Sequence, residues 1–159
     1  MKWTGGCLCG GIRYECDEDP VSAGTCHCRI CKKWTGAAYN SIAGFPVSGL
    51  RFTKGQPKIY TGAVTIKELG FCADCGSPIW DRYLVQLNEG DPFGPDTVWI
   101  PIGTLDEPER VTLEFHYGVE TQLPWVHFDD ALPRTRCDED PGLAAAFEVV
   151  KSRNFESKA

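Results

Sequence analysis

The chain has 159 residues, of which 42% are hydrophobic and 24% are charged, and these values are ordinary for a globular protein of one domain. Its formal net charge of -6 offers no general attraction to phosphate groups, so nucleic acid is a poor candidate as a partner. No apolar run is long enough to cross a membrane, and the residues after Met1 lack the apolar segment of a secretion signal, so we expect a cytoplasmic protein.

The expected secondary structure consists mostly of short strands separated by turns that contain many of the seventeen glycines and eleven prolines. In chain order, the predicted strands are 12–16, 50–52, 58–60, 64–71, 79–83 (antiparallel to the one before it), 98–102 and 111–119. A loop rich in glycine and proline is expected over 88–96. The sole helix that the sequence predicts covers 142–151, with Asp140 as its cap and Pro141 in its first turn. The pattern therefore indicates a mainly β fold with a short C-terminal helix.

The nine cysteines require an explanation. An odd number in a chain without a secretion signal argues against a disulfide framework. Cysteines at close spacing in a reducing compartment are instead typical metal ligands. Seven of the nine fall into three such groups, which are Cys7 and Cys9, Cys26, Cys28 and Cys31, and Cys72 and Cys75.

The first and last groups together predict one closed zinc site. Cys7 and Cys9 are two residues apart, so in extended backbone their sulfurs lie on the same face. Cys72 and Cys75 have the spacing of a zinc knuckle, and Gly76 after them accepts the backbone conformation of a tight turn. Four thiolates complete a tetrahedron, and closed sites of this kind are structural.

The middle group, Cys26, Cys28 and Cys31, predicts a second zinc site with an open position. Two closed sites would need about eight ligands, and the three groups supply seven. An open position on zinc is the pattern of a catalytic site, and a thiolate-rich zinc favours a soft ligand there, such as a substrate thiol.

Several alternatives remain open at this stage. The fourth ligand of the second site could be His27, although its side chain would face away from those of its neighbours in extended backbone. Spacing alone also allows Cys26 and Cys28 to pair with Cys72 and Cys75. Cys28 and Cys31 could instead form a redox pair. The other residues that could close the second site are Cys16, Cys137, His116 and His127.

Positive charge flanks the middle cysteine group. Arg29 and Lys32, together with Lys33, could attract an anionic substrate on an otherwise acidic protein, or could simply form a solvated turn. On the first interpretation, Arg29 or Lys32 contacts a carboxylate of the thiol substrate.

The cysteine motifs resemble those of the glutathione-dependent formaldehyde-activating enzyme family, which also includes centromere protein V. The resemblance runs from about residue 5 to residue 136. The segments that carry it are Gly6–Tyr14, Cys26–Gly36, Phe71–Ser77, Ile102–Pro108, Phe115–Tyr117 and Asp129–Arg134.

The resemblance implies a zinc-binding fold of small packed antiparallel sheets, called a β-tent, over 1–137, with 138–159 as a helical tail. It implies two zinc ions, a structural one on Cys7, Cys9, Cys72 and Cys75 and a catalytic one on the middle group. It also implies a carbon–sulfur lyase that acts on the adduct of glutathione and formaldehyde. The loop 88–96 looks like an insertion relative to the family, and the tail after 137 looks like an addition.

Two functional hypotheses follow. In the first, a small thiol such as glutathione binds the open position of the second zinc as a thiolate and exchanges with its aldehyde adduct. In the second, both zinc ions are structural and the protein is a non-enzymatic binding module. Thiol binding at Cys26, Cys28 and Cys31 would distinguish the two.

Overall fold

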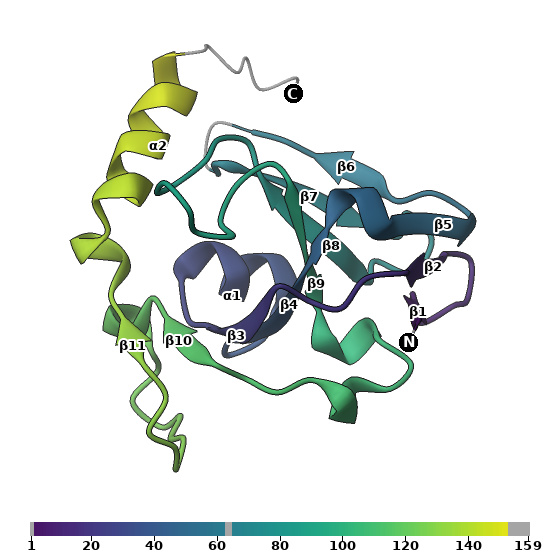
Figure 1. Cartoon of the computed structure of the whole chain (residues 1–159), viewed down its shortest axis with the longest axis horizontal. Helices are drawn as coiled ribbons and strands as arrows, with labels where there is room; N and C mark the ends of the chain where they lie inside the picture. Colours follow the sequence, from purple (N-terminus) through teal and green to yellow (C-terminus); the bar gives the residue numbers. More distant parts are fainter. Residues whose placement is uncertain (1, 63–64, 153–159) are drawn as a thin grey trace.

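The computed structural model describes residues 2–62 and 65–152, and in this part of the chain strands predominate over helices (Figure 1). The strands are β1 (Trp3–Gly6), β2 (Arg13–Cys16), β3 (Ser22–Cys26), β4 (Asn40–Pro46), β5 (Leu50–Lys54), β6 (Lys58–Tyr60), β7 (Lys67–Phe71), β8 (Pro78–Tyr83), β9 (Thr97–Pro101), β10 (Phe115–Tyr117) and β11 (Arg134–Thr135). The α-helices are α1 (Arg29–Thr35) and α2 (Pro141–Ser152).

The described strands form two sheets. The smaller sheet has the order β1-β2-β5, and the larger has the order β11-β10-β3-β4-β9-β8-β7-β6. Most neighbours are antiparallel, but β10 pairs in parallel with both β3 and β11. The mainly β fold of antiparallel sheets with a short C-terminal helix is therefore confirmed.

Most predicted strands are present at nearly their predicted positions. The strand predicted over 79–83 is β8, and it pairs antiparallel with β7 as expected. The strand predicted over 64–71 begins at Lys67, and its predicted first residue lies outside the described residues. Of the strand predicted over 111–119, only Phe115–Tyr117 forms a strand, which pairs with β3 and β11.

The sequence predicted a single helix, and this was wrong, because the structure contains α1 as well as α2. Helix α1 has seven residues, which is too short to show a helical repeat of apolar positions. Its N-cap is Cys28, whose sulfur accepts a hydrogen bond from the Cys31 amide, and Gly36 ends it in the left-handed conformation at φ 69°. The N-cap is hard to recognise in the sequence, because Cys28 is also a candidate metal ligand.

The apolar side chains form two core clusters. The first packs between the two sheets, and its centre includes Tyr14, Phe45 and Ile100, each almost fully buried. The second lies beneath the helices, where Trp99 is fully buried and Phe93 stacks on it with ring centroids 4.7 Å apart. Cys26 and Cys31 belong to this second cluster, so one cysteine group is built into a core.

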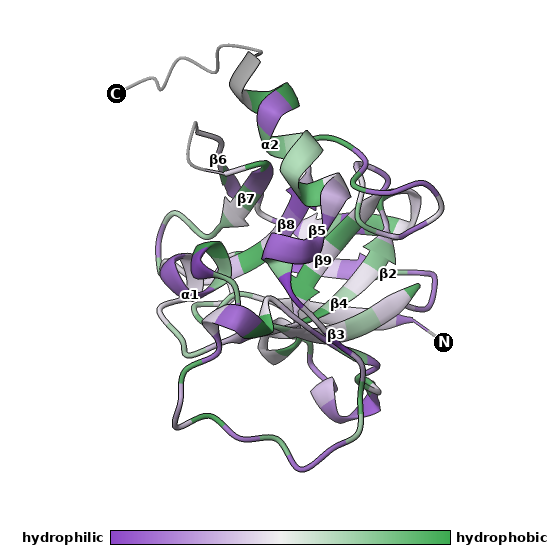
Figure 2. Cartoon of the chain, turned by 90° about the vertical axis from the view of Figure 1, so that its left-hand side faces the viewer, coloured by the Kyte–Doolittle hydropathy of each residue, from purple (hydrophilic) through white to green (hydrophobic). Residues whose placement is uncertain are grey.

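Helix α2 packs one apolar face onto the second core cluster and leaves the other in solvent. Leu143, Ala146, Phe147 and Val150 form the packed face at helical spacing, with Ala146 and Val150 buried. Figure 2 faces the side of the molecule that carries α2 and shows both hydrophobic and hydrophilic residues along the helix.

Asp140 holds the start of α2. Its Oδ1 accepts hydrogen bonds from the backbone amides of Gly142 (3.0 Å) and Leu143 (3.2 Å), as an N-cap does. The Tyr117 hydroxyl donates to its Oδ2 at 2.6 Å, and Asn88 Nδ2 donates to its Oδ1 at 3.1 Å. Partial burial acts to raise the pKa of Asp140, but these four donors outweigh it and the pKa lies below its usual value.

We expect the contribution of Asp140 to stability to depend on pH in a defined direction. A carboxyl whose folded pKa is depressed stabilises the native state above its unfolded pKa, about 3.9, and loses that contribution as pH falls through the lower folded value. The Leu143 amide resonance, followed by NMR against pH, should shift with a midpoint below about 3.9. In Asp140→Asn this transition should vanish, and a wild-type midpoint at or above the unfolded value would contradict the assignment.

No helix among the described residues is long and apolar enough to cross a membrane.

Candidate metal centres

The first cysteine cluster joins the loop after β1 to the loop after β7. The sulfurs of Cys7, Cys9, Cys72 and Cys75 all lie within 4.8 Å of one another, with Cys7 and Cys9 3.5 Å apart and Cys9 and Cys72 3.8 Å apart. This spacing suits four thiolates around one tetrahedral ion. The structure thus brings together the four residues that the sequence proposed as one site.

Two tight turns position these four sulfurs. In the second turn, the Cys72 amide donates to the Ser77 carbonyl oxygen at 2.9 Å and the Gly76 amide donates to that of Cys72 at 2.9 Å. Gly76 has φ 76°, a left-handed conformation that favours glycine. The Ser77 hydroxyl lies 3.2 Å from the Cys75 sulfur, and hydrogen bonds from the Ser77 side chain and backbone lower the pKa of that thiol to about 6. The turn therefore prepares a thiolate.

The second cluster lies where β3 leads into α1. The sulfurs of Cys26, Cys28 and Cys31 all lie within 4.8 Å of one another, and Cys26 and Cys31 are buried. Within residues 2–62 and 65–152, no histidine, carboxylate or further cysteine joins this group. Hydrogen bonds from the neighbouring thiols, first Cys26 and then Cys31, hold the pKa of Cys28 well below its usual value. The three sulfurs are thus suited to one metal ion with a position left open.

The structure places the alternative fourth ligands elsewhere. His27 points away from the three sulfurs, and its Nε2 lies 3.1 Å from His116 Nδ1. Cys16 is fully buried in the first core cluster, and burial raises the pKa of its thiol to about 12. His127 is exposed. Cys137 lies near Cys28 without joining the group of three, and burial raises the pKa of its thiol.

A buried histidine pair supports the loop that carries Cys26 and Cys28. His116 Nε2 lies 3.0 Å from Asp130 Oδ2, so His27, His116 and Asp130 form a chain from the interior to the surface. The backbone amide of His27 donates to the Tyr117 carbonyl oxygen at 2.8 Å, and the Thr121 hydroxyl donates to that of His27 at 2.8 Å. Strand β10 therefore fixes both the main chain and the side chain between two candidate ligands.

A buried ion pair lies beside the second cluster and was missed by sequence reasoning. Lys67 Nζ is 2.8 Å from Asp81 Oδ1, and the two side chains are 4% and 0% exposed. The Lys67 ammonium also lies 4.4 Å from the centroid of the Tyr83 ring. Burial acts against its charge, but Asp81, then Tyr83 and Cys31, outweigh burial and keep the pKa of Lys67 well above its usual value. The pair therefore holds the Lys67 ammonium group, together with its carboxylate partner, near the cysteine sulfurs.

A cavity of about 290 Å³ adjoins the second cluster. Of the three sulfur-bearing residues, only Cys28 lines it, and Lys67 lines it from the start of β7. The remaining lining residues are Arg29, Ile30, Ile66, Tyr117, Glu120, Thr121, Cys137, Leu143 and Phe147. We call this space the metal-side cavity. It is the route by which a small molecule could reach Cys28.

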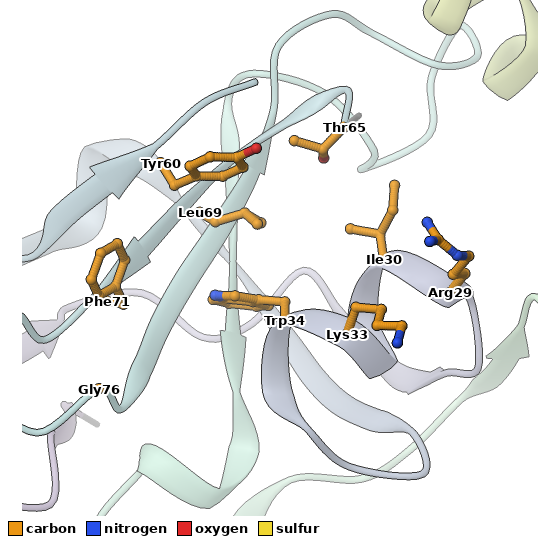
Figure 3. Close-up of a pocket in the computed structure, with 9 residues that line it drawn as sticks. All are labelled: Arg29, Ile30, Lys33, Trp34, Tyr60, Thr65, Leu69, Phe71 and Gly76. Atoms are coloured by element: carbon orange, nitrogen blue, oxygen red, sulfur yellow. The ribbon is translucent and has the colours of Figure 1, made fainter. Parts of the chain in front are cut away.

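A larger cavity of about 450 Å³ lies between α1 and strands β6 and β7. Figure 3 shows Trp34 facing Leu69 across it, with Arg29 and Lys33 on the helix side. Arg29 and Ile30 also line the metal-side cavity, so the two cavities adjoin along α1. The two residues predicted to contact the substrate, Arg29 and Lys32, therefore lie in different surroundings. Arg29 lines both cavities, whereas Lys32 lines neither and its Nζ donates to the Thr121 carbonyl oxygen.

Comparison with known proteins identifies the class of protein that this fold and these clusters define. Residues 2–120 match the family described as glutathione-dependent formaldehyde-activating enzyme, and the chain belongs to that family. Among solved structures, the chain is similar to a crystal structure of a Rhodobacter sphaeroides protein, a structural genomics target. The two share 20% sequence identity with a TM-score of 0.48, over 85% of this chain and 100% of the other.

Proposed function

We propose that this protein is a zinc-dependent carbon–sulfur lyase that acts on the adduct of a small thiol and an aldehyde, such as S-hydroxymethylglutathione. The observation that carries the proposal is the cluster of Cys26, Cys28 and Cys31, which lacks a fourth ligand among the described residues and borders a cavity through Cys28. Three protein ligands and one accessible position are the arrangement of catalytic zinc sites. Membership of the formaldehyde-activating family supports the same reaction class.

The donor sets fit zinc at both clusters. Cys7, Cys9, Cys72 and Cys75 would hold a structural ion, and Cys26, Cys28 and Cys31 would hold the second ion. When bound at the second site, zinc would stabilise the sulfur of a substrate as a thiolate.

The reaction is the reversible addition of a thiol to an aldehyde. In the cleavage direction, the carbon–sulfur bond of the adduct breaks, its electron pair remains on sulfur, and the hydroxyl proton passes to water as the aldehyde carbonyl forms. The Lys67 ammonium near the sulfurs offsets part of the negative charge that a further thiolate brings. Arg29, which lines both cavities, is placed to bind a carboxylate of the substrate.

The test of this function is Cys28→Ser, assayed for zinc content, thiol binding and adduct cleavage. We expect about two zinc ions per chain in the wild type and about one in the variant, because the closed site remains intact. The variant should stay folded, as judged by far-UV circular dichroism, and should lose both lyase activity and the binding of glutathione and of a small alkyl thiol.

The matched control is Cys137→Ser, which changes a neighbouring cysteine outside the group of three and should retain both zinc ions. Full activity in Cys28→Ser after loss of its second zinc would overturn the proposal. Two zinc ions in the wild type with no binding of either thiol would favour the alternative, a non-enzymatic binding module stabilised by zinc.

A further inference from the structure

One wall of the metal-side cavity comes from outside the segment that matches the family. Cys137, Leu143 and Phe147 line the cavity, whereas the family match ends at residue 120. Leu143 and Phe147 are four residues apart on α2, so they lie on the same face of the helix. Figure 1 shows α2 running along the flank of the molecule, outside the sheets. The helix therefore adds a boundary to a cavity that the family segment forms only in part.

The loop 88–96 and the residues just before it hold this wall in place. Phe93 stacks between Trp99 and Tyr117, with ring centroids 4.7 and 5.7 Å away. Beside it, a Cβ at Gly142 would come within 2.2 Å of the Leu87 carbonyl oxygen, so the start of α2 lies directly against this loop. No residue of 88–96 lines either cavity. The loop thus acts on the metal-side cavity through α2 rather than by covering the metal cluster.

The size and lining of the metal-side cavity indicate the kind of thiol it accepts. Its volume of about 290 Å³ lies at the lower limit of small-molecule sites, which usually span about 300–1,000 Å³. Ile30, Ile66, Leu143 and Phe147 give it apolar walls. Lys67 is already paired with Asp81, so its charge is not free to bind a substrate carboxylate. Arg29 also lines the larger cavity, and Glu120 brings a negative charge to the lining, so the cavity offers a carboxylate a cation only where it meets the larger cavity. A short aliphatic chain fits these walls, whereas the charged ends of a tripeptide would lose hydration against them.

We infer that α2 makes the metal-side cavity selective for compact thiols with an uncharged aliphatic body over the larger, charged glutathione. This inference rests on the proposed function, because it assumes that a thiol reaches Cys28. It makes Leu143 and Phe147 specificity-determining residues that the family segment does not contain.

The experiment compares dissociation constants of propane-1-thiol and glutathione for the zinc-loaded full chain, measured by titration calorimetry. The wild type should bind propane-1-thiol more tightly. In Phe147→Ala, the dissociation constant of glutathione divided by that of propane-1-thiol should fall by about tenfold. The small thiol loses a contact in this variant, and glutathione gains room. Gly142→Ala, which pushes α2 away from Leu87 without touching the cavity wall, should shift the ratio in the same direction.

The matched control is Val149→Ala, which truncates an exposed residue of the same helix outside the cavity wall and should leave the ratio unchanged. Phe147→Leu, a milder truncation, replaces Phe147→Ala if that variant fails to fold. Thiol binding with an unaltered ratio in the Phe147 and Gly142 variants would overturn the inference and leave the proposed function standing. Absence of thiol binding in the wild type and in every variant would overturn both.

Discussion

Replacing Cys72 by serine is expected to unfold the protein. Cys72 is 2% exposed and joins the loop after β7 to the loop after β1, so a metal at this cluster closes a long segment of chain. Structural zinc contributes about 10–16 kcal/mol to folding, which is comparable to the whole stability of a domain, about 5–15 kcal/mol. Far-UV circular dichroism and zinc content measure the outcome, and the variant should show neither a cooperative thermal transition nor bound zinc.

Cys28→Ser provides the comparison, since it removes one sulfur from the other cluster and should leave a folded chain. The contrast between the two variants separates the roles of the clusters. If Cys72→Ser unfolds cooperatively at a melting temperature close to that of the wild type, the first cluster does not hold a structural metal.

The second large effect is expected for Lys67→Met. The substitution keeps the length of the side chain but leaves Asp81, which is 0% exposed, without its ammonium partner. Removing one partner of a buried ion pair lowers the free energy of unfolding by about 3–5 kcal/mol, because an uncompensated charge remains in the interior. Urea denaturation monitored by tryptophan fluorescence should show this loss in the free energy of unfolding.

The double variant Lys67→Met, Asp81→Leu tests the cause of that loss. It removes both charges and keeps apolar volume, so it should recover most of the stability lost in the single variant. Lys2→Met, which removes the cation of the surface pair between Lys2 and Glu15, is a suitable control, since surface pairs contribute about 0–1 kcal/mol. A double variant as unstable as Lys67→Met would show that packing around Lys67, rather than the ion pair, determines the effect.

The sequence predicted the metal clusters well because short-range spacing determines much of their geometry. Cys72 and Cys75 are brought together by one turn, and Cys26, Cys28 and Cys31 by one strand end and one helical turn. Spacing alone left open the pairing of the first group with the last, in which Cys9 and Cys72 are 63 residues apart. The number of ligands that a closed site needs favoured this pairing, the resemblance to the family implied it as well, and the structure places the sulfurs accordingly. Their roles as ligands, and the domain boundary at residue 137, remain predictions.

The residues that surround the second cluster could be predicted less well from the sequence. In a strand, a lysine such as Lys67 is read as solvent-facing, and only the tertiary register shows otherwise. Lys67 pairs with Tyr83 and Leu69 pairs with Asp81, so the two charges are diagonal neighbours on adjacent strands. The contact of α2 with the metal-side cavity is likewise a long-range arrangement. Helix propensity predicted the helix, but it carries no information about what the apolar face covers.

Cys28 has two roles in this fold, and together they couple the affinity for a metal ion to the formation of helix α1. Its sulfur belongs to the second cluster and also caps α1, a helix of seven residues that is too short to be stable alone. Helix α1 in turn carries Arg29, Ile30 and Trp34, which line the larger cavity. Binding of an ion at Cys28 and formation of α1 are therefore thermodynamically linked, so the free energy of metal binding also helps to build the walls that a substrate would contact.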